Sequence, residues 1–267
     1  MRRGRAGTLA LRYVALAYIG LLVALPVGLI VWRTFAHGAG PVWHALTSSE
    51  ARHALKVTAE VTVITVVANT VFGVGAAVLL VRHRFPGRRI MDALIDLPLA
   101  VSPVVVGLAL ILVYGRTTGF GGWLASHGVH VIFALPGMVA ATIFVSLPLV
   151  VREVAPVLEE IGVDQEQAAW TLGASTPQAF RRVTLPAIRW ALAYGVVLTV
   201  ARALGEYGAV AVVSGRLVGK TQTATLFVED RYQNFDQAAA YAMAFMLAAV
   251  AVVILLGITA LRPKEHR

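Results

Sequence analysis

The sequence contains no cysteine. Disulfide bonds, thiolate catalysis and cysteine-ligated metal sites are therefore excluded for this chain. Charged residues are also scarce, because Asp, Glu, Lys and Arg make up 14% of the sequence, against about 25% in an average soluble domain. Apolar residues take their place, with 58% of the chain in the hydrophobic set and a mean hydropathy of +0.76. We therefore predict an integral membrane protein with a large lipid-facing surface.

Acidic residues are the rarer kind of charge. The chain has 14 Asp and Glu against 23 Lys and Arg, which gives a formal net charge of +9. A basic excess is typical of nucleic-acid binding when it forms a single patch. Here the arginines occur in short groups between long apolar runs, which is the pattern of membrane topology. We therefore predict contact with membrane lipid and no nucleic-acid partner.

Long uncharged stretches set the expected number of membrane spans. A bilayer core about 30 Å thick needs roughly 20 apolar residues in a helix. The sequence predicts an all-α integral membrane protein in which residues 1–267 form a single transmembrane domain of six helices. The predicted spans are residues 14–32, 57–81, 92–115, 131–151, 190–215 and 238–261.

The distribution of basic residues predicts which loops face the cytoplasm. With the N-terminus inside, 15 of the 23 Lys and Arg lie in cytoplasmic segments and seven lie in external ones, while Arg202 lies within a span. Cytoplasmic loops of membrane proteins carry an excess of Lys and Arg. Both termini are therefore predicted to be cytoplasmic.

The longest predicted cytoplasmic loop, residues 152–189, contains signals for two short helices. Asp164 is placed to cap the first helix, and Gly173 suits a left-handed ending. Thr176 is placed to cap the second helix, and Pro186 is expected to limit its far end. This loop is therefore predicted to be a folded cytoplasmic element.

A run of small residues in this loop has a distinctive spacing. It reads Gln167-Ala168-Ala169, then Gly173 after three residues, then Val183-Thr184-Leu185-Pro186 after nine more. The series resembles the Glu-Ala-Ala (EAA) loop of binding-protein-dependent ABC importer permeases, whose coupling helix docks into a groove on the ATPase subunit. Small residues allow a short helix to approach a partner's backbone, and the apolar Trp170 and Leu172 need a surface on which to bury. The plain alternative is a surface helix of small residues.

The chain departs from the family pattern at two positions of this loop. Gln167 stands where the family usually has glutamate, although Glu166 is adjacent, and Val183 replaces the usual isoleucine. The second change is conservative. The first means that no specific salt bridge from position 167 to the ATPase is inferred.

The resemblance extends over nearly the whole chain. Segments that look like the W-type permeases of sulfate/thiosulfate importers are residues 85–88, 102–105, 172–175, 180–186 and 201–210. Molybdate and tungstate permeases share the general pattern, so these anions remain alternative substrates. The tripeptide Val213-Ser214-Gly215 favours the sulfate branch.

This resemblance implies a type I ABC importer permease fold, multi-pass in the inner (cytoplasmic) membrane. It also implies a division of labour, in which a periplasmic or lipoprotein sulfate-binding protein delivers the anion and this chain forms the pathway with a second homologous permease. ABC ATPase subunits supply the energy, so the chain itself is expected to have no ATP site, no catalytic residues and no cofactor. The residues expected to couple to the ATPase are Glu166, Gln167, Ala168, Ala169, Leu172, Gly173, Leu185 and Pro186.

Arg202 and Glu206 are charged residues inside a predicted span, and their spacing of four places them on one helix face. Each is costly in lipid unless it is paired or faces a water-filled cavity. They predict either an internal ion pair that fixes helix packing or a source of positive potential along an anion pathway. Ser102, in the third predicted span, is a further candidate for the pathway.

Other signals are weaker. Residues 215–221 resemble a phosphate-binding loop but have three residues between the glycines, where four are needed. The seven histidines form no pair with metal-ligand spacing, so no metal site is predicted. Asp92 and Asp96 lie four apart near the start of the third span, where they favour the helix dipole; a proton relay is the alternative.

Two other classes of function fit the sequence less well. An ion-coupled secondary transporter of anions usually contains an internal repeat and pairs of broken helices, which the sequence does not indicate. A membrane scaffold without transport function leaves the charged pair inside a span unexplained.

Overall fold

The computed structural model describes residues 3–36 and 38–261, and every regular element in these residues is a helix. The predicted all-α class is therefore confirmed for this part of the chain. In chain order the elements are α1 (Arg3–Ile19), η1 (Gly20–Ala24, a π-helix), α2 (Leu25–Phe35), α3 (Ala39–Thr47), α4 (Ser49–Arg82), α5 (Arg88–Ala100), α6 (Pro103–Tyr114), α7 (Gly119–Ser126), α8 (Leu135–Ile161), α9 (Asp164–Thr171), α10 (Thr176–Ala179), η2 (Phe180–Thr184, a π-helix), α11 (Leu185–Leu204), α12 (Gly208–Val213), α13 (Ala224–Gln233) and α14 (Gln237–Leu261).

Among the described residues, five helices are long and apolar enough to cross a membrane. They are Leu11–Phe35, Ser49–Arg82, Leu135–Ile161, Thr176–Leu204 and Gln237–Ile258. α5 and α6 meet the same criterion only as a pair, and the pair is bent by 115°. Counting the bent pair as one span gives the six that the sequence predicts.

The predicted span 92–115 is wrong as one straight helix. α5 ends at Ala100, and α6 begins at Pro103. Val101 and Ser102, between them, have extended backbone angles (ψ of 134° at both). Proline lacks an N–H and disfavours helical backbone at the preceding residue, so the sequence Ser102-Pro103 breaks the helix.

The predicted span 190–215 is also divided. α11 ends at Leu204 and α12 begins at Gly208, so residues 205–207 lie outside both helices. Gly205 is one of two glycines that flank this break. Glycine is a poor helix former because it loses the most backbone entropy on becoming helical. The fifth span is therefore a helix that ends at 204, followed by a short separate helix.

Pro186 does not end the short helix α10, contrary to the sequence prediction. The chain instead continues through η2 into α11, and the N–H of Leu185 donates to the carbonyl of Phe180, five residues earlier. Pro186 lies in the first turn of α11, directly after this wider turn. The π-helical turn thus carries the chain past a residue that cannot donate a backbone hydrogen bond. The predicted cytoplasmic element is therefore continuous with the fifth span.

Val150 of α8 lies at a close approach of three helices, and its side chain has no exposed surface. A Cβ atom at Gly73 of α4 would lie 2.7 Å from the Cβ of Val150. A Cβ atom at Gly195 of α11 would lie 3.0 Å from the Cα of the same residue. Glycines at these positions allow α4 and α11 to approach α8 at the distance seen, as small residues do between membrane helices.

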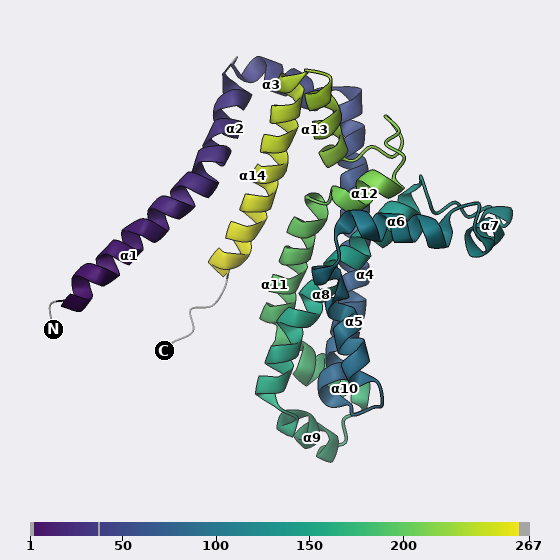
Figure 1. Cartoon of the computed structure of the whole chain (residues 1–267). Coiled ribbons are helices and arrows are strands. Elements are labelled where there is room, and N and C mark those ends of the chain that lie inside the picture. Colours follow the sequence, from purple (N-terminus) through teal and green to yellow (C-terminus); the bar gives the residue numbers. More distant parts are fainter. Residues whose placement is uncertain (1–2, 37, 262–267) are drawn as a thin grey trace.

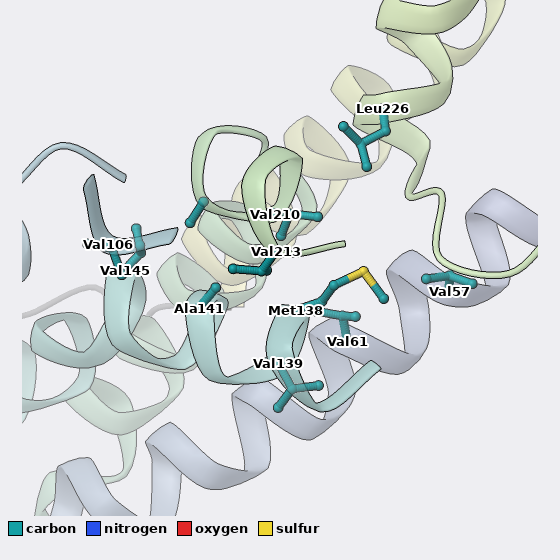
Figure 2. Close-up of a cluster of buried hydrophobic side chains, with 11 residues drawn as sticks. Val57, Val61, Val106, Met138, Val139, Ala141, Val145, Val210, Val213 and Leu226 are labelled. Carbon is teal, nitrogen blue, oxygen red and sulfur yellow. The ribbon is translucent and has the colours of Figure 1, made fainter. Parts of the chain in front are cut away.

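Buried apolar side chains continue this packing toward the helix breaks, where α4, α6, α8, α12 and α13 meet (Figure 2). The cluster holds α12 against α8, although α12 is only six residues long. The members of this cluster that are labelled in Figure 2 are Val57, Val61, Val106, Met138, Val139, Ala141, Val145, Val210, Val213 and Leu226.

The helix formed by α1, η1 and α2 stands apart from the bundle and approaches it at α14 (Figure 1). The start of α1 and the end of α14 lie at the same end of the molecule as α9, while α3 and α13 lie at the opposite end (Figure 1). The placement of both termini in the cytoplasm, with α9, stays a prediction. Four basic residues that contribute to it lie outside the described residues, namely Arg2, Arg262, Lys264 and Arg267.

We expect Gly73→Ala to destabilise the protein, because the new methyl group would collide with the Cβ of Val150, which no rotation of that side chain can remove. Gly75→Ala is the matched control, since a Cβ atom there meets no atom within 4 Å. Alanine is favoured over glycine inside a helix by about 0.5–1 kcal/mol. The thermal unfolding midpoint, followed by tryptophan fluorescence, should fall for Gly73→Ala and hold or rise for Gly75→Ala; equal midpoints would contradict the close contact.

Candidate functional site

Helix α9 ends in a left-handed turn at Gly173, as predicted. Gly173 has φ of +85°, and its N–H donates to the carbonyl of Trp170 at 2.9 Å. The N–H of Ala174 donates to the carbonyl of Ala169 at 3.0 Å. Together these two hydrogen bonds form a Schellman motif. Its left-handed residue is usually glycine, because glycine has no Cβ atom to strain that conformation. The small residues of the EAA-like series therefore lie on a helix with a fixed end.

The predicted caps of α9 and α10 are each displaced by one residue. Asp164 is the first residue inside α9, and Val163 precedes it without a side-chain cap. The acidic residue still favours the helix dipole from this position. Ser175, not Thr176, precedes α10, and its N–H donates to the side-chain oxygen of Gln178 at 2.9 Å.

An apolar surface is exposed at the end of α9. Leu172 is 88% exposed and Trp170 is 45% exposed. Gln167, Ala168 and Gly173 are also exposed. A hollow beside them has walls from α9, α10 and η2, formed by Ala169, Leu172, Gly173, Ala174, Gln178, Ala179, Arg182 and Val183. Such a surface is unfavourable in water and is typical of a site where a partner binds.

Two residues predicted for the same surface have different surroundings. Leu185 is half-buried and packs against the apolar cluster between α4 and α8, while Pro186 is exposed in the first turn of α11. They lie in α11, which follows the exposed end of α9 after α10 and η2. Their contribution to a docking surface is therefore separate from that of Leu172 and Gly173.

Glu166 is predicted with the docking residues, but its side chain turns inward and is 10% exposed. Its carboxylate accepts hydrogen bonds from Arg82 Nη2 at 3.2 Å and from Thr184 Oγ1 at 2.7 Å. Arg82 Nε lies 3.2 Å from the second carboxylate oxygen. The carboxylate is thus used within the chain.

Sequence reasoning missed the roles of Arg82 and Thr184. Arg82 ends a long apolar run and was counted only as a cytoplasmic charge, while Thr184 stands inside the EAA-like series as a residue of no assigned role. The only general rule that applies is that a buried acidic residue needs a partner, which would have indicated a partner for Glu166. The sequence alone does not say that Glu166 is buried.

The two helix breaks described above lie against each other. A Cβ atom at Gly208, the first residue of α12, would lie 3.0 Å from Pro103 Cβ, at the start of α6. A Cβ atom at Gly107 would lie 2.7 Å from the Cβ of Val212. The segments that follow the breaks therefore pack as a pair. Ser102, predicted as a pathway residue, is exposed at the N-cap of α6, beside this contact.

Arg202 and Glu206 form the expected ion pair, with Arg202 Nη1 2.8 Å from Glu206 Oε2. They do not share one helix face as predicted, because α11 ends before Glu206. Because Glu206 lies outside α11, its carboxylate can also accept a hydrogen bond from the N–H of Ala209, in the first turn of α12, at 2.9 Å. Thr225 Oγ1 donates to the carbonyl of Glu206 at 2.9 Å. The side chain of Glu206 is 2% exposed and that of Arg202 is 38% exposed, so the pair joins a buried acid to an accessible base.

Arg152 of α8 binds both acidic residues of α5. Its Nη2 lies 2.9 Å from Asp92 Oδ1, and its Nε lies 2.7 Å from Asp96 Oδ1. The two carboxylates thus tie the first half of the bent span to the central helix, which favours the structural interpretation over a proton relay. Among the described residues, no cluster of three or more His, Asp or Glu has the arrangement of a metal site.

Together these features form two sites on one helical frame. An exposed apolar and small-residue surface lies on α9, at one end of the bundle, and a pair of broken helices with an ion pair lies between the two ends (Figure 1). The first suits protein docking. The second offers the exposed residue Ser102 and the partly exposed guanidinium of Arg202 in a membrane-spanning region, which suits passage of a polar solute.

Residues 69–267 match the family model described as "Binding-protein-dependent transport system inner membrane component". The chain is 50% identical over 241 residues to the sulfate transport system permease protein CysW of Synechocystis sp., covering 90% of this chain and 87% of that protein. It is 38% identical over 253 residues to the sulfate transport system permease protein CysT of Escherichia coli K12, covering 95% of this chain and 91% of that protein.

Two crystal structures of a bacterial ABC transporter for alginate have the same fold. One, of the transporter involved in alginate import, aligns with a TM-score of 0.80 at 16% identity and covers 97% of this chain and 96% of that chain. The other, in complex with an alginate pentasaccharide-bound periplasmic protein, has a TM-score of 0.78 at 16% identity and covers 96% and 93%. The expected type I ABC importer permease fold is thereby confirmed.

Proposed function

Because the chain belongs to the family of binding-protein-dependent transport system inner membrane components, we propose that it is a permease subunit of an ATP-driven importer of sulfate or thiosulfate. The single observation that carries the substrate is the 50% identity to a sulfate transport permease over 90% of the chain. The protein is accordingly a multi-pass component of the inner membrane.

The proposed division of labour leaves ATP hydrolysis to partner subunits. This chain supplies half of the pathway, and a second homologous permease supplies the other half, as the similarity to both CysW and CysT of sulfate systems supports. A periplasmic or lipoprotein sulfate-binding protein delivers the anion. The complex of the alginate transporter with its periplasmic protein supports this type of assembly.

Coupling to the ATPase is proposed to take place at the end of α9. The exposed Leu172 and Trp170 supply apolar area, and the left-handed Gly173 holds the helix end without a side chain in the way. Gln167 and Ala168 lie on the exposed part of the same helix. Alternating access then follows when the ATPase dimer closes and displaces this element.

Arg202 is proposed to stabilise the break in the fifth span by pairing with Glu206. The break leaves a buried carboxylate in the membrane region, and an unpaired charge there is costly. Arg202 has a second possible role, because its exposed part can add positive potential along the anion path. Ser102 is a polar group at the other break. The two roles predict different results when both charges are removed.

We expect a strain that lacks this chain to lose uptake of radiolabelled sulfate and to regain it when the chain is supplied again. Purified alone, the chain should hydrolyse no ATP, while the assembled complex should. Molybdate and tungstate, added in excess, test the alternative substrates. Loss of sulfate uptake in the presence of either competing anion, or uptake that persists without the ATPase, would contradict the proposal.

Gly173→Leu should abolish attachment of the ATPase and transport, because the bulky side chain projects from the proposed docking surface. It also forces a β-carbon into left-handed backbone, which costs about 1–2 kcal/mol. Gly219→Leu is the control for that strain, since Gly219 has φ of +70° and also meets no atom within 4 Å of a new Cβ. Co-purification of the ATPase with each tagged variant measures attachment. Equal recovery with both variants would place the docking surface elsewhere.

Arg202→Gln should lower sulfate uptake in a complex that still hydrolyses ATP, because Glu206 keeps only Ala209 as a donor. The double variant Arg202→Gln with Glu206→Gln leaves no buried charge, and we expect it to restore most of the uptake. Restoration indicates that pairing is the main task of Arg202. Continued loss of uptake in a folded double variant would instead favour the pathway role.

A further inference from the structure

Arg82 joins three helices although it lies at the very end of α4. Its Nη1 donates to the carbonyl of Leu158 in the last turn of α8, at 2.8 Å. Its Nη2 and Nε both contact the carboxylate of Glu166, in the first turn of α9. The arginine side chain is 9% exposed and that of Glu166 is 10% exposed, so this is a buried ion pair.

The arginine therefore bridges the corner between α8 and α9, which turns at Gly162 with φ of +63°. The last four carbonyls of a helix have no partner inside it, and Arg82 binds one of them. A positive group at a helix C-terminus and an acidic group in a first helical turn are both favoured by the helix dipoles. Each charge of the pair thus has a second favourable contact.

Thr184 extends the network to a fourth element. Its hydroxyl donates to the same Glu166 oxygen that Arg82 binds, at 2.7 Å, and the residue is 3% exposed. Thr184 is the last residue of η2, and α11 begins at the next residue. Glu166 consequently connects α9 to α4 on one side and to the start of α11 on the other.

The apolar packing around α9 is incomplete, so the attachment of α9 depends more on these hydrogen bonds and the ion pair. A hollow of about 320 Å³ lies between α9 and the end of α4, and its walls include Val78, His83, Val163 and Trp170. Apolar contact across this gap is therefore incomplete. The polar network crosses it, and removing one member of a buried ion pair leaves an uncompensated charge, which is strongly destabilising.

We propose that Arg82, Glu166 and Thr184 are positioning residues that make α9 move as one body with α4, α8 and α11. A displacement of α9 by the ATPase then reaches all three membrane-spanning helices together. Without the network, α9 can rock on the Gly162 corner while the spans stay in place. This inference rests on the proposed docking of the ATPase to α9, but it concerns the connection inside this chain.

The test measures sulfate transported and ATP hydrolysed together, in liposomes that contain the complete transporter with its binding protein. Glu166→Gln and Arg82→Gln should lower the sulfate transported per ATP by about tenfold, because each leaves one buried charge unpaired. Arg82→Lys keeps the charge but not the forked geometry, so its ratio should be intermediate. Thr184→Val removes one hydroxyl and should give a milder loss. Glu160→Gln, an exposed change of the same type on α8, should leave the ratio unchanged.

A second measurement does not depend on transport. The native chain has no cysteine, so spin labels can be attached at Gln165→Cys on α9 and Glu159→Cys on α8, both exposed. With the network intact, the distance between the labels should be narrow and the same with and without bound ATP. In Glu166→Gln it should broaden or change when ATP binds.

The outcomes separate the two proposals. If the unmodified complex moves no sulfate, the proposed function fails, and the label distances still report on the network. If assembled variants keep the normal ratio and the normal distances, the network has no positioning role. Should Glu166→Gln fail to assemble, Thr184→Val decides the matter in the same two assays.

Discussion

The close approach of α4 and α11 to Val150 of α8 is the contact on which the rest of this structure depends. Gly73 and Gly195 remove the side chains that would hold the helices apart, so three long spans share one interface. Apolar side chains gain little by leaving lipid for a neighbouring helix, and close packing therefore supplies much of the association. The bent span α5–α6, the short helix α12 and the helices α9 and α10 are all attached to this three-helix frame.

The frame uses charged groups in a consistent way. Arg152 ties α5 to α8, Arg82 ties α9 to α4 and α8, and Arg202 closes the break after α11. In each case the arginine binds carboxylates that lie on another element or beyond a helix end. These arginines thus hold the irregular parts of the fold. A forked guanidinium suits this task because it binds two acceptors at fixed angles.

Sequence reasoning reached the regular parts of the fold and the local signals. It identified the helical class, the ending of α9 at Gly173 and the partnership of Arg202 with Glu206, because each depends on residues close in sequence. It predicted one helix through Ser102-Pro103, where the structure has a bend, because hydropathy does not change there. It also took Pro186 for a helix end, because a π-helical turn leaves no mark in composition. The inward turn of Glu166 depends on Arg82, 84 residues earlier, and no local pattern carries that information.

The separate position of the first span has a consequence for synthesis at the ribosome. Its contacts within the chain are made chiefly with the last span, through the hydroxyl of Thr34, which donates to the carbonyl of Tyr241, and through the rings of Phe35 and Phe245. Those partners are about 207 residues apart in the sequence. At roughly 5–20 residues per second, the first helix waits about 10–40 s in the bilayer before its partner is made. It must therefore be stable in the bilayer as a single helix during translation. The helix contains no acidic residue, which favours that stability.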